Sequence, residues 1–375
     1  MAVSRREAFA LLGTTIGVGA LAACSSPQTD QKASASPAAS ETSPNAGTDP
    51  RFEQAKHNVR YDSGARDPFV LLHVSDFHGD GEALGRVMSW AKAHDGMFDD
   101  ILATGDLTSL VFSDGMGHWD KVDGAGRVLT CIGNHDVFDV MEPTPQPYDK
   151  VSVSEAAARY VDAYAGSWGT IDHAKGTTWY AKDCSERGIR LVVLDCMLYP
   201  GIHSEKEAAE QDAWLEATLA DAAKQGLTVV VAEHFPLTKE CTVDCSWAPF
   251  DRTIAGKGIL DARVTDRVQA FIDAGGSFAC YLCGHTHADA AHTLDGRPEQ
   301  FALAVPCATA VPDQIKWGDM DRSQEATRDA YNVVFVDTVN KLVKVVRVGA
   351  DRDLALQHRG TLCWNYGAHR LVHAD

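Results

Sequence analysis

The 375-residue chain carries 34 basic and 52 acidic side chains, which gives a formal net charge of −18 at neutral pH. This acidic balance argues against nucleic acid as a partner, because proteins that bind phosphate backbones depend on Lys and Arg. With 45% hydrophobic and 23% charged residues, the composition is typical of a globular protein that can bury a large core. The length allows one large domain or two ordinary ones.

The first residues have the pattern of an export signal. A basic start at Arg5 and Arg6 precedes an uncharged run, 8–23, which is shorter than a membrane span and ends in small residues. We therefore expect residues 1–23 to be a signal peptide. The arginine pair is similar to a twin-arginine signal, but Phe9 comes one residue later than in that signal, so the general secretory route stays open as an alternative.

Residues 21–24, Leu-Ala-Ala-Cys, resemble the lipobox of bacterial lipoproteins. The resemblance implies cleavage before Cys24 and attachment of lipid to its sulfur. It also implies a location on the outer face of a bacterial cytoplasmic membrane. No later apolar run in the sequence approaches the roughly 18 residues of a membrane span, so the lipid is the only membrane anchor expected.

A stretch of low complexity follows the lipobox. Residues 25–50 contain no aromatic and no branched aliphatic side chain. Such a segment cannot offset its ordering entropy by burial, so residues 24–54 are expected to be a lipidated cysteine and a disordered tether. The remainder, residues 55–375, is predicted to be one folded domain without internal repeats.

Short apolar runs of strand length recur along this domain. They are rich in Val, Ile and Leu and apolar on both faces, which is typical of strands that are covered on both sides. The runs are 69–74, 100–105, 127–133, 189–195, 227–233 and 278–284. Helical patterns separate several of them, at 82–94, 205–226 and 261–276. The alternation predicts right-handed crossovers and a largely parallel sheet.

The C-terminal part has a different pattern. Residues 332–348 are predicted to form a hairpin with its turn near Asn340. The predicted fold class is therefore α/β, with mainly parallel strands flanked by helices and an antiparallel hairpin at the end.

Polar clusters come just after five of the apolar runs. They are Asp76-Phe77-His78, Gly105-Asp106, Gly133-Asn134-His135-Asp136, His234, and Gly284-His285-Thr286-His287. The carboxyl ends of strands form the edge at which open α/β sheets bind ligands. Residues far apart in the sequence are therefore expected to converge on one crevice.

Seven residues of these clusters offer the oxygen or nitrogen donors that divalent metals accept. They are Asp76, His78, Asp106, Asn134, His234, His285 and His287. No thiolate is among them. The mixed set suits Mn, Fe, Zn, Co or Ni, and two such ions about 3.5–4 Å apart would clamp an in-line displacement at phosphorus. Two divalent ions and two carboxylates leave a local charge of about +2, which attracts phosphate although the whole chain is acidic.

The order of the five motifs resembles that of the calcineurin-like metallophosphoesterase family over residues 69–290. The resemblance implies a metallophosphoesterase-type β-sandwich and two divalent metal ions. The implied ligands are Asp76, His78 and His287 for one metal and Asn134, His234 and His285 for the other, with Asp106 bridging both. The family mechanism is attack of a metal-bridging hydroxide on phosphorus. By the same resemblance, His135 would stabilise or protonate the leaving oxygen. Asp136 is expected to buttress the loop, and a direct chemical role is the alternative.

The chain departs from two branches of the superfamily. Protein phosphatases carry an Asp three residues after the bridging Asp, followed by Arg, and purple acid phosphatases place a metal-binding Tyr at the same point. Here Ser109 and Leu110 stand at these positions, so both branches are disfavoured. Ser109 also leaves His135 without the usual acidic partner. The remaining resemblance is to the broad bacterial phosphodiesterase and phosphatase branch.

The predicted function is metal-dependent hydrolysis of a small phosphoester at the cell surface, with diesters favoured. Residues 107–120 and 137–149, which flank the ligands, contain no Lys or Arg, and a diester needs less positive charge around it than a monoester dianion. A distant Arg252 or Arg297 folding back would defeat this argument. A phosphomonoesterase or nucleotidase is one alternative, and a surface lipoprotein that binds metal without turnover is an alternative of another class.

Nine of the ten cysteines follow Cys24. Cys241 and Cys245 lie in a polar loop and could form a disulfide in an oxidising compartment. Several others lie in or beside apolar runs and are predicted to be small buried hydrophobic residues. These are Cys131, Cys196, Cys280 and Cys283.

Overall fold

The computed structural model describes residues 66–108, 115–137, 151–198, 205–237, 262–287, 290–308, 328–349 and 361–372. These ranges belong to one compact unit, residues 46–375. The predicted signal peptide, the lipidated cysteine, the tether and the Cys241–Cys245 pair lie outside the described residues, as do Ser109 and Arg252. Within the described ranges, no helix has the length and apolar character needed to span a bilayer.

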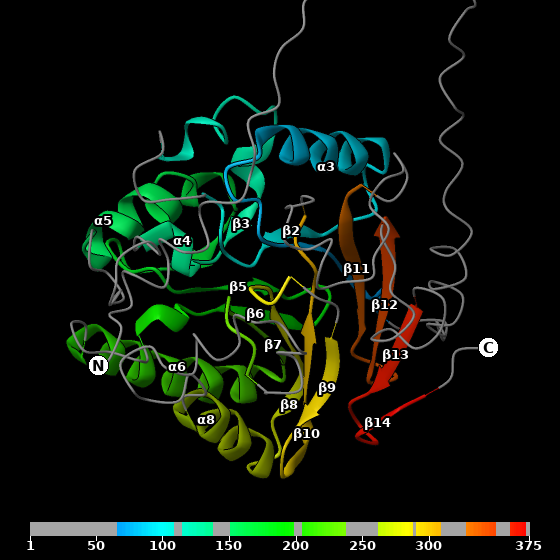
Figure 1. The fold of residues 1–375 in the computed structure, drawn as a ribbon. Coiled ribbons are helices and arrows are strands. Elements are labelled where there is room, and N and C mark those ends of the chain that lie inside the picture. The colour runs from blue at the N-terminus through cyan, green and yellow to red at the C-terminus, as the bar shows by residue number, and fades with distance from the viewer. Residues whose placement is uncertain are drawn as a thin grey trace, which may run out of the picture. The chain divides into compact units, whose positions relative to one another are not determined.

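Two β-sheets form the centre of the described fold (Figure 1). The first contains β1 (Phe69–Val74), β2 (Asp100–Ala103), β3 (Leu129–Thr130), β11 (Ala330–Asp337), β12 (Leu342–Gly349), β13 (Thr361–Asn365) and β14 (Arg370–Leu371). The second contains β4 (Ile171–Asp172), β5 (Tyr180–Cys184), β6 (Ile189–Val193), β7 (Thr228–Ala232), β8 (Ser277–Cys283), β9 (Ala290–Leu294) and β10 (Arg297–Ala304). The strand orders are β14-β13-β12-β11-β1-β2-β3 and β4-β5-β6-β7-β8-β10-β9.

Each sheet combines parallel and antiparallel strands. In the first sheet β1, β2 and β3 are parallel, and β11 to β14 continue from β1 in antiparallel pairs. In the second sheet β6, β7, β8 and β10 are parallel. The predicted hairpin is confirmed, because β11 pairs with β12 around a turn at residues 338–341. The predicted α/β fold class is also confirmed, but the parallel strands are divided between two sheets.

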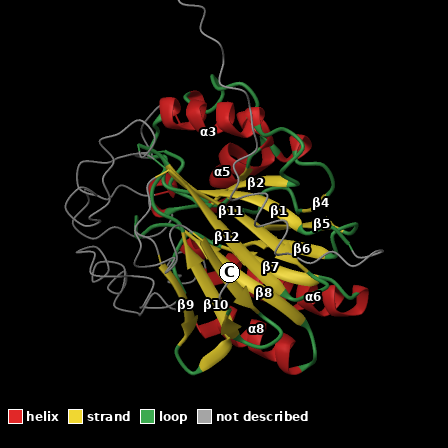
Figure 2. Cartoon of the chain, turned by 90° about the vertical axis from the view of Figure 1, so that its right-hand side faces the viewer, coloured by secondary structure: helices red, strands yellow, loops and turns green. Residues whose placement is uncertain are grey.

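Helices cover the outer sides of the two sheets (Figure 2). The longer ones are α3 (Gly81–Ala93), α6 (Glu205–Gln225) and α8 (Ala262–Asp273). Shorter helices are α4 (Asn134–Val137) and α5 (Val153–Ala157), with 3-10 turns η1 (Gly115–Gly117), η2 (Ala125–Arg127), η4 (Ala165–Ser167) and η5 (Cys196–Leu198). Segment η3 (Ala158–Asp162) is π-helical and directly continues α5. The three predicted helices are thus present, each within a few residues of its expected ends.

The start of α3 follows from its local sequence. Asp80 is the N-cap, and its carboxylate accepts hydrogen bonds from the main-chain N–H groups of Glu82 and Ala83. Such a cap satisfies donors that the first turn of a helix leaves unpaired. Arg86 binds both carboxylate oxygens of Asp329 at 2.7–3.1 Å, which ties α3 to the beginning of β11. The helix therefore fixes the polar turn that precedes it.

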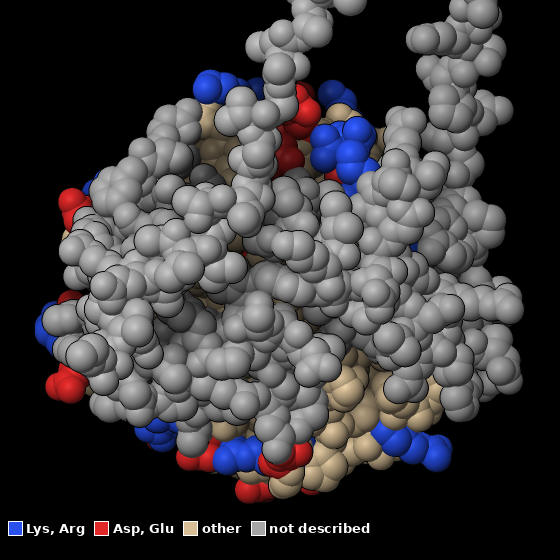
Figure 3. All heavy atoms as spheres, viewed as in Figure 1, with Lys and Arg blue, Asp and Glu red and all other residues tan. Residues whose placement is uncertain are grey.

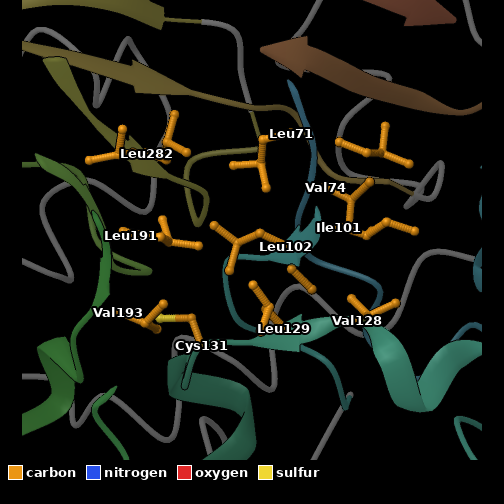
Figure 4. Close-up of a cluster of buried hydrophobic side chains, with 14 of the residues drawn as sticks. Leu71, Val74, Ile101, Leu102, Val128, Leu129, Cys131, Leu191, Val193 and Leu282 are labelled. Carbon is orange, nitrogen blue, oxygen red and sulfur yellow. The ribbon is translucent and has the colours of Figure 1, made fainter. Parts of the chain in front are cut away.

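The strands are apolar on both faces because each face is covered. Leu71 and Leu102 of the first sheet face Leu191 and Leu282 of the second, as Figure 4 shows, and these four residues belong to one buried cluster. The neighbouring residue on β6, Val192, points the other way into a second cluster with α6 and α8. On the surface in Figure 3, basic and acidic side chains are interspersed over the described part of the face.

Candidate metal centre

All seven predicted ligands lie in the described residues, each just after the carboxyl end of a parallel strand. Asp76 and His78 follow β1, Asp106 follows β2, and Asn134 follows β3. His234 follows β7, and His285 and His287 follow β8. Main-chain hydrogen bonds join neighbouring turns within each sheet, from Asp76 N–H to Gly105 O at 3.1 Å and from Gly284 N–H to His234 O at 3.0 Å. A further one joins the two sheets, from Ala308 N–H to Ser75 O at 2.8 Å. The two sheets therefore deliver these residues to one place.

The backbone at this edge adopts conformations that side-chain-bearing residues rarely take. The φ angle is positive at Asp76 (55°), His78 (48°), Asp106 (49°), His285 (67°) and His287 (56°). Each such residue costs about 1–3 kcal/mol and persists only where the surroundings enforce it. The strain coincides with the predicted ligands, which is typical of a functional site.

The first of two ligand groups contains Asp76, His78, Asp106 and His287, whose donor atoms all lie within 4.8 Å of one another. The Nε2 atoms of His78 and His287 are 2.9 Å apart. His287 Nε2 also lies 3.2 Å from Asp76 Oδ1. Donor atoms bonded to one ion at about 2.0–2.2 Å lie roughly 3–3.5 Å apart, which is the spacing of these contacts.

The second group contains Asp106, His234 and His285. His234 Nε2 is at its centre, 3.3 Å from Asp106 Oδ2, 3.1 Å from His285 Nδ1 and 3.0 Å from Asn134 Oδ1. The other ring nitrogen of His234 bonds the main-chain oxygen of Thr104 at 2.7 Å, which fixes the orientation of the ring. Asp106 belongs to both groups, as a bridging ligand must.

The two carboxylates fit a pair of cations. Asp76 Oδ2 accepts a hydrogen bond from His285 N–H at 3.0 Å, and Asp106 Oδ1 accepts one from His135 N–H at 2.8 Å. The remaining oxygens, Asp76 Oδ1 and Asp106 Oδ2, are buried and have no hydrogen-bond donor among the described residues. A buried, uncompensated carboxylate oxygen is costly, and a divalent ion would supply the missing charge.

Electrostatics keeps both carboxylates ionised. Burial raises the pKa of Asp76, but the neighbouring His287 more than offsets this and holds it at about 2. Burial likewise raises the pKa of Asp106, yet the nearby His234 and His135 keep it well below its usual range. Both groups are therefore anionic before an ion binds. Burial lowers the pKa of His234, but Asp106 raises it to about 10, so this ring must release a proton to become a ligand.

Two glycines allow the close approach of the turns. A Cβ atom on Gly133 would lie 2.2 Å from the main-chain nitrogen of Asp106. A Cβ atom on Gly284 would lie 1.9 Å from Ser75 Oγ and 2.7 Å from Asp76 Oδ2. Because neither distance is possible for real atoms, glycine is required at both positions if the ligands are to meet.

The Asn-His-Asp segment forms the single turn α4, and Asp136 holds it in place. Asp136 Oδ2 accepts from Gly133 N–H at 2.8 Å, and Oδ1 accepts from the main chain and hydroxyl of Thr108 at 3.0 and 3.1 Å. This is the geometry that the predicted buttressing role requires. His135 lies beside both ligand groups: its Nε2 is 3.9 Å from Asp106 Oδ2, and its side chain is 21% exposed.

The sequence interpretation missed one group at this edge, the Cys307 thiol. Its sulfur lies with the ring nitrogens of His78 and His287 in a third cluster of potential ligands, and it donates to the main-chain oxygen of Asp76 at 2.8 Å. Cys307 follows β10, which is parallel to β8 and so ends at the same edge. The apolar run before it, residues 301–305, was the available signal.

This geometry agrees with a comparison with known families. The model of the calcineurin-like phosphoesterase family matches residues 69–289, more than half of the chain. The chain belongs to the calcineurin-like phosphoesterase family. It is therefore a metal-dependent phosphoester hydrolase with a dinuclear divalent metal centre, and its Asp and His clusters are candidate ligands for that centre. No curated protein sequence matches the chain.

Solved structures resemble this calcineurin-like phosphoesterase at low sequence identity. A dimetal phosphatase from Danio rerio is 14% identical with a TM-score of 0.48, covering 76% of this chain and 97% of that chain. A predicted phosphoesterase from Streptococcus pneumoniae is 12% identical with a TM-score of 0.33, covering 77% and 97%. A phosphopantetheinyl hydrolase from Mycobacterium tuberculosis is 15% identical with a TM-score of 0.31, covering 65% and 91%.

Proposed function

We propose that this phosphoesterase hydrolyses small phosphodiesters with two ions held by the seven predicted ligands. Asp76, His78 and His287 would hold one ion, and Asn134, His234 and His285 the other. The observation that carries the assignment is the position of Asp106, which belongs to both ligand groups and has one buried oxygen without a hydrogen-bond donor in the described ranges.

When bound, the two ions polarise the phosphoryl oxygens and activate the attacking water. The chain's own residues supply orientation. The main-chain N–H of His135 fixes Asp106 Oδ1, so that Oδ2 points at the ion sites. The same contact places the partly exposed His135 ring next to the place where phosphate would bind. An imidazole N–H there would donate a hydrogen bond to the leaving oxygen.

The preference for diesters rests on charge. The strongest electrostatic neighbours of Asp76 and Asp106 are histidines. Arg297 begins β10 and pairs with Asp266, so it lies at the strand end opposite to the one that precedes Cys307. Eight strand residues span about 23 Å, which keeps that guanidinium away from the ligands. A monoester dianion would therefore find less compensation than a diester monoanion.

The substrate class can be read from one kinetic ratio. On Mn-loaded protein, kcat/KM for bis-p-nitrophenyl phosphate is expected to exceed that for p-nitrophenyl phosphate about tenfold. A tenfold advantage of the monoester, about 1.4 kcal/mol in transition-state binding, would instead favour the phosphomonoesterase or nucleotidase alternative. Absence of hydrolysis of both esters would contradict the enzyme and favour a surface protein that binds metal without turnover.

We also propose that the enzyme is exported and anchored by lipid on Cys24 to the outer face of a bacterial cytoplasmic membrane. The support is the sequence of residues 1–24, which lies outside the described residues. We further propose that the enzyme has no nucleic-acid partner, which the net charge of −18 supports.

Cys24→Ser is expected to move the protein out of the membrane fraction, because the acyl chains are the only anchor predicted. Fractionation followed by immunoblotting measures this, with Ser26→Ala as the matched control that keeps the cysteine. Unmutated protein free in the cytosol would contradict the export proposal.

A further inference from the structure

The turn that carries Asn134 and His135 is held by more than its own Asp136. Within this turn, the main-chain oxygen of Asp136 accepts a hydrogen bond from the phenol of Tyr160 at 3.0 Å. Tyr160 is 1% exposed. Its own main-chain oxygen accepts a hydrogen bond from the Thr130 hydroxyl. Tyr160 therefore contacts the segment at two points. One is Thr130 of β3, before the turn, and the other is Asp136, within the turn.

A second residue that contacts the turn is Thr108. Its hydroxyl contacts the main-chain oxygen of His135 at 3.3 Å and Asp136 Oδ1 at 3.1 Å. Thr108 lies two residues after Asp106, whereas Tyr160 comes from the π-helical segment after α5. The turn is thus held from the Asp106 loop and from a separate helical segment, and the Tyr160 phenol also interacts with the Thr108 hydroxyl.

The two functional residues of the turn differ in what else holds them. Asn134 Oδ1 lies 3.0 Å from His234 Nε2, at the proposed second ion, which would itself fix the amide. His135 is assigned no ion. Its ring contacts the His78 ring, with centroids 4.7 Å apart, and its Nε2 lies 3.9 Å from Asp106 Oδ2, so the path of the turn determines whether these contacts are kept. A looser turn should therefore displace the His135 ring more than it weakens metal binding.

We propose that Tyr160 is a positioning residue that sets the place of His135 through the carbonyl of Asp136. The inference rests on the proposed function, in which His135 assists departure of the leaving oxygen. A misplaced assisting group stabilises the transition state less, so kcat falls. The binding of substrate in the ground state stays nearly unchanged.

The test is a double-mutant cycle of Tyr160→Phe and His135→Ala on zinc- or manganese-reconstituted protein. Tyr160→Phe alone is expected to lower kcat for bis-p-nitrophenyl phosphate about tenfold, with KM and metal content unchanged within about twofold. In the His135→Ala background the same change should lower kcat less than about twofold, because the group it positions is gone.

Tyr164→Phe is the matched control. Tyr164 lies in the turn that directly follows this helical segment and donates to Asp120 Oδ1 at 2.7 Å at the surface, so the same atom is removed without touching the turn that carries His135. Its kcat should equal that of the unmutated enzyme. Replacement of Tyr160 by p-aminophenylalanine, which keeps an N–H donor at that place, should restore most of the lost kcat.

Two results would overturn the inference while the phosphoesterase assignment stands. One is an equal loss of kcat from Tyr160→Phe with and without the His135 side chain. The other is loss of metal in the Tyr160→Phe variant. Inactivity of the unmutated enzyme on every phosphoester would overturn both. If Tyr160→Phe does not fold, Thr108→Val takes its place in the cycle, since it removes the hydroxyl that contacts the main-chain oxygen of His135 and the carboxylate of Asp136. An equal loss of kcat with and without the His135 side chain would again contradict the inference that the turn acts through His135.

Discussion

Asp106→Asn is expected to remove metal and activity together. Metal content should fall from about two ions per chain to fewer than one, and kcat/KM should fall about a thousandfold or more. The reason is that the substitution removes one of the two carboxylate charges at the site and replaces one oxygen by an amide nitrogen that cannot bind a cation. Asp106 Oδ2 is the buried oxygen that faces His234 at 3.3 Å.

Metal analysis after reconstitution and desalting, beside steady-state kinetics, measures both effects. Asp273→Asn is the matched control, because Asp273 ends α8, which leads through residues 274–276 into the amino end of β8, at the edge opposite to the ligands. That variant should keep full metal content and activity. An Asp106→Asn variant that retains two ions would contradict the bridging role.

His135→Ala should separate turnover from metal binding. We expect kcat to fall about 10²–10³-fold, in the range typical of a general acid, while the metal content stays near two ions per chain. His135 contributes its main-chain N–H to Asp106, and this contact survives the substitution. Its ring lies at the edge of both ligand groups without belonging to either.

His94→Ala provides the control for loss of an imidazole. His94 caps the C-terminus of α3, and its Nδ1 bonds the main-chain oxygen of Trp90, away from the ligand groups. It should leave kcat unchanged. Loss of metal from His135→Ala equal to that from Asp106→Asn would show that the roles of ligand and assisting group have been assigned incorrectly.

The sequence predicted the place of the ligands because their signal is local. An apolar run followed directly by polar residues marks a strand end, and the strand ends of parallel sheets meet at one edge. Asp76, Asp106 and His234 follow their runs in this way. The hairpin at 332–348 was predictable for the same reason, since its alternation and its turn lie within one short stretch.

The division of the strands into two sheets was not predictable from local patterns. The predicted strands at 69–74 and 189–195 have the same apolar character, yet they lie in different sheets. Only long-range packing of pairs such as Leu102 and Leu191 distinguishes them. Strand β3 is shorter than the run 127–133 suggested, because Arg127 belongs to the preceding 3-10 turn and the chain leaves the sheet after Thr130.

Groups that act through main-chain contacts were also invisible in the sequence. The Cys307 thiol donates to the main-chain oxygen of Asp76, which is 231 residues away in the sequence. The Tyr160 phenol donates to the main-chain oxygen of Asp136. Neither contact leaves a motif, because a carbonyl oxygen is the same at every residue. The positive φ angles at the predicted ligands were also not predictable, since the preference of Asp and His for positive φ is too weak to indicate them from the sequence.

The central claim is that seven side chains from both sheets hold two ions, and a crystal of Mn-loaded protein tests it most directly. An anomalous difference map is expected to show two peaks, one beside Asp76, His78 and His287 and one beside Asn134, His234 and His285, with Asp106 touching both. A single peak, or peaks on other residues, would contradict the account.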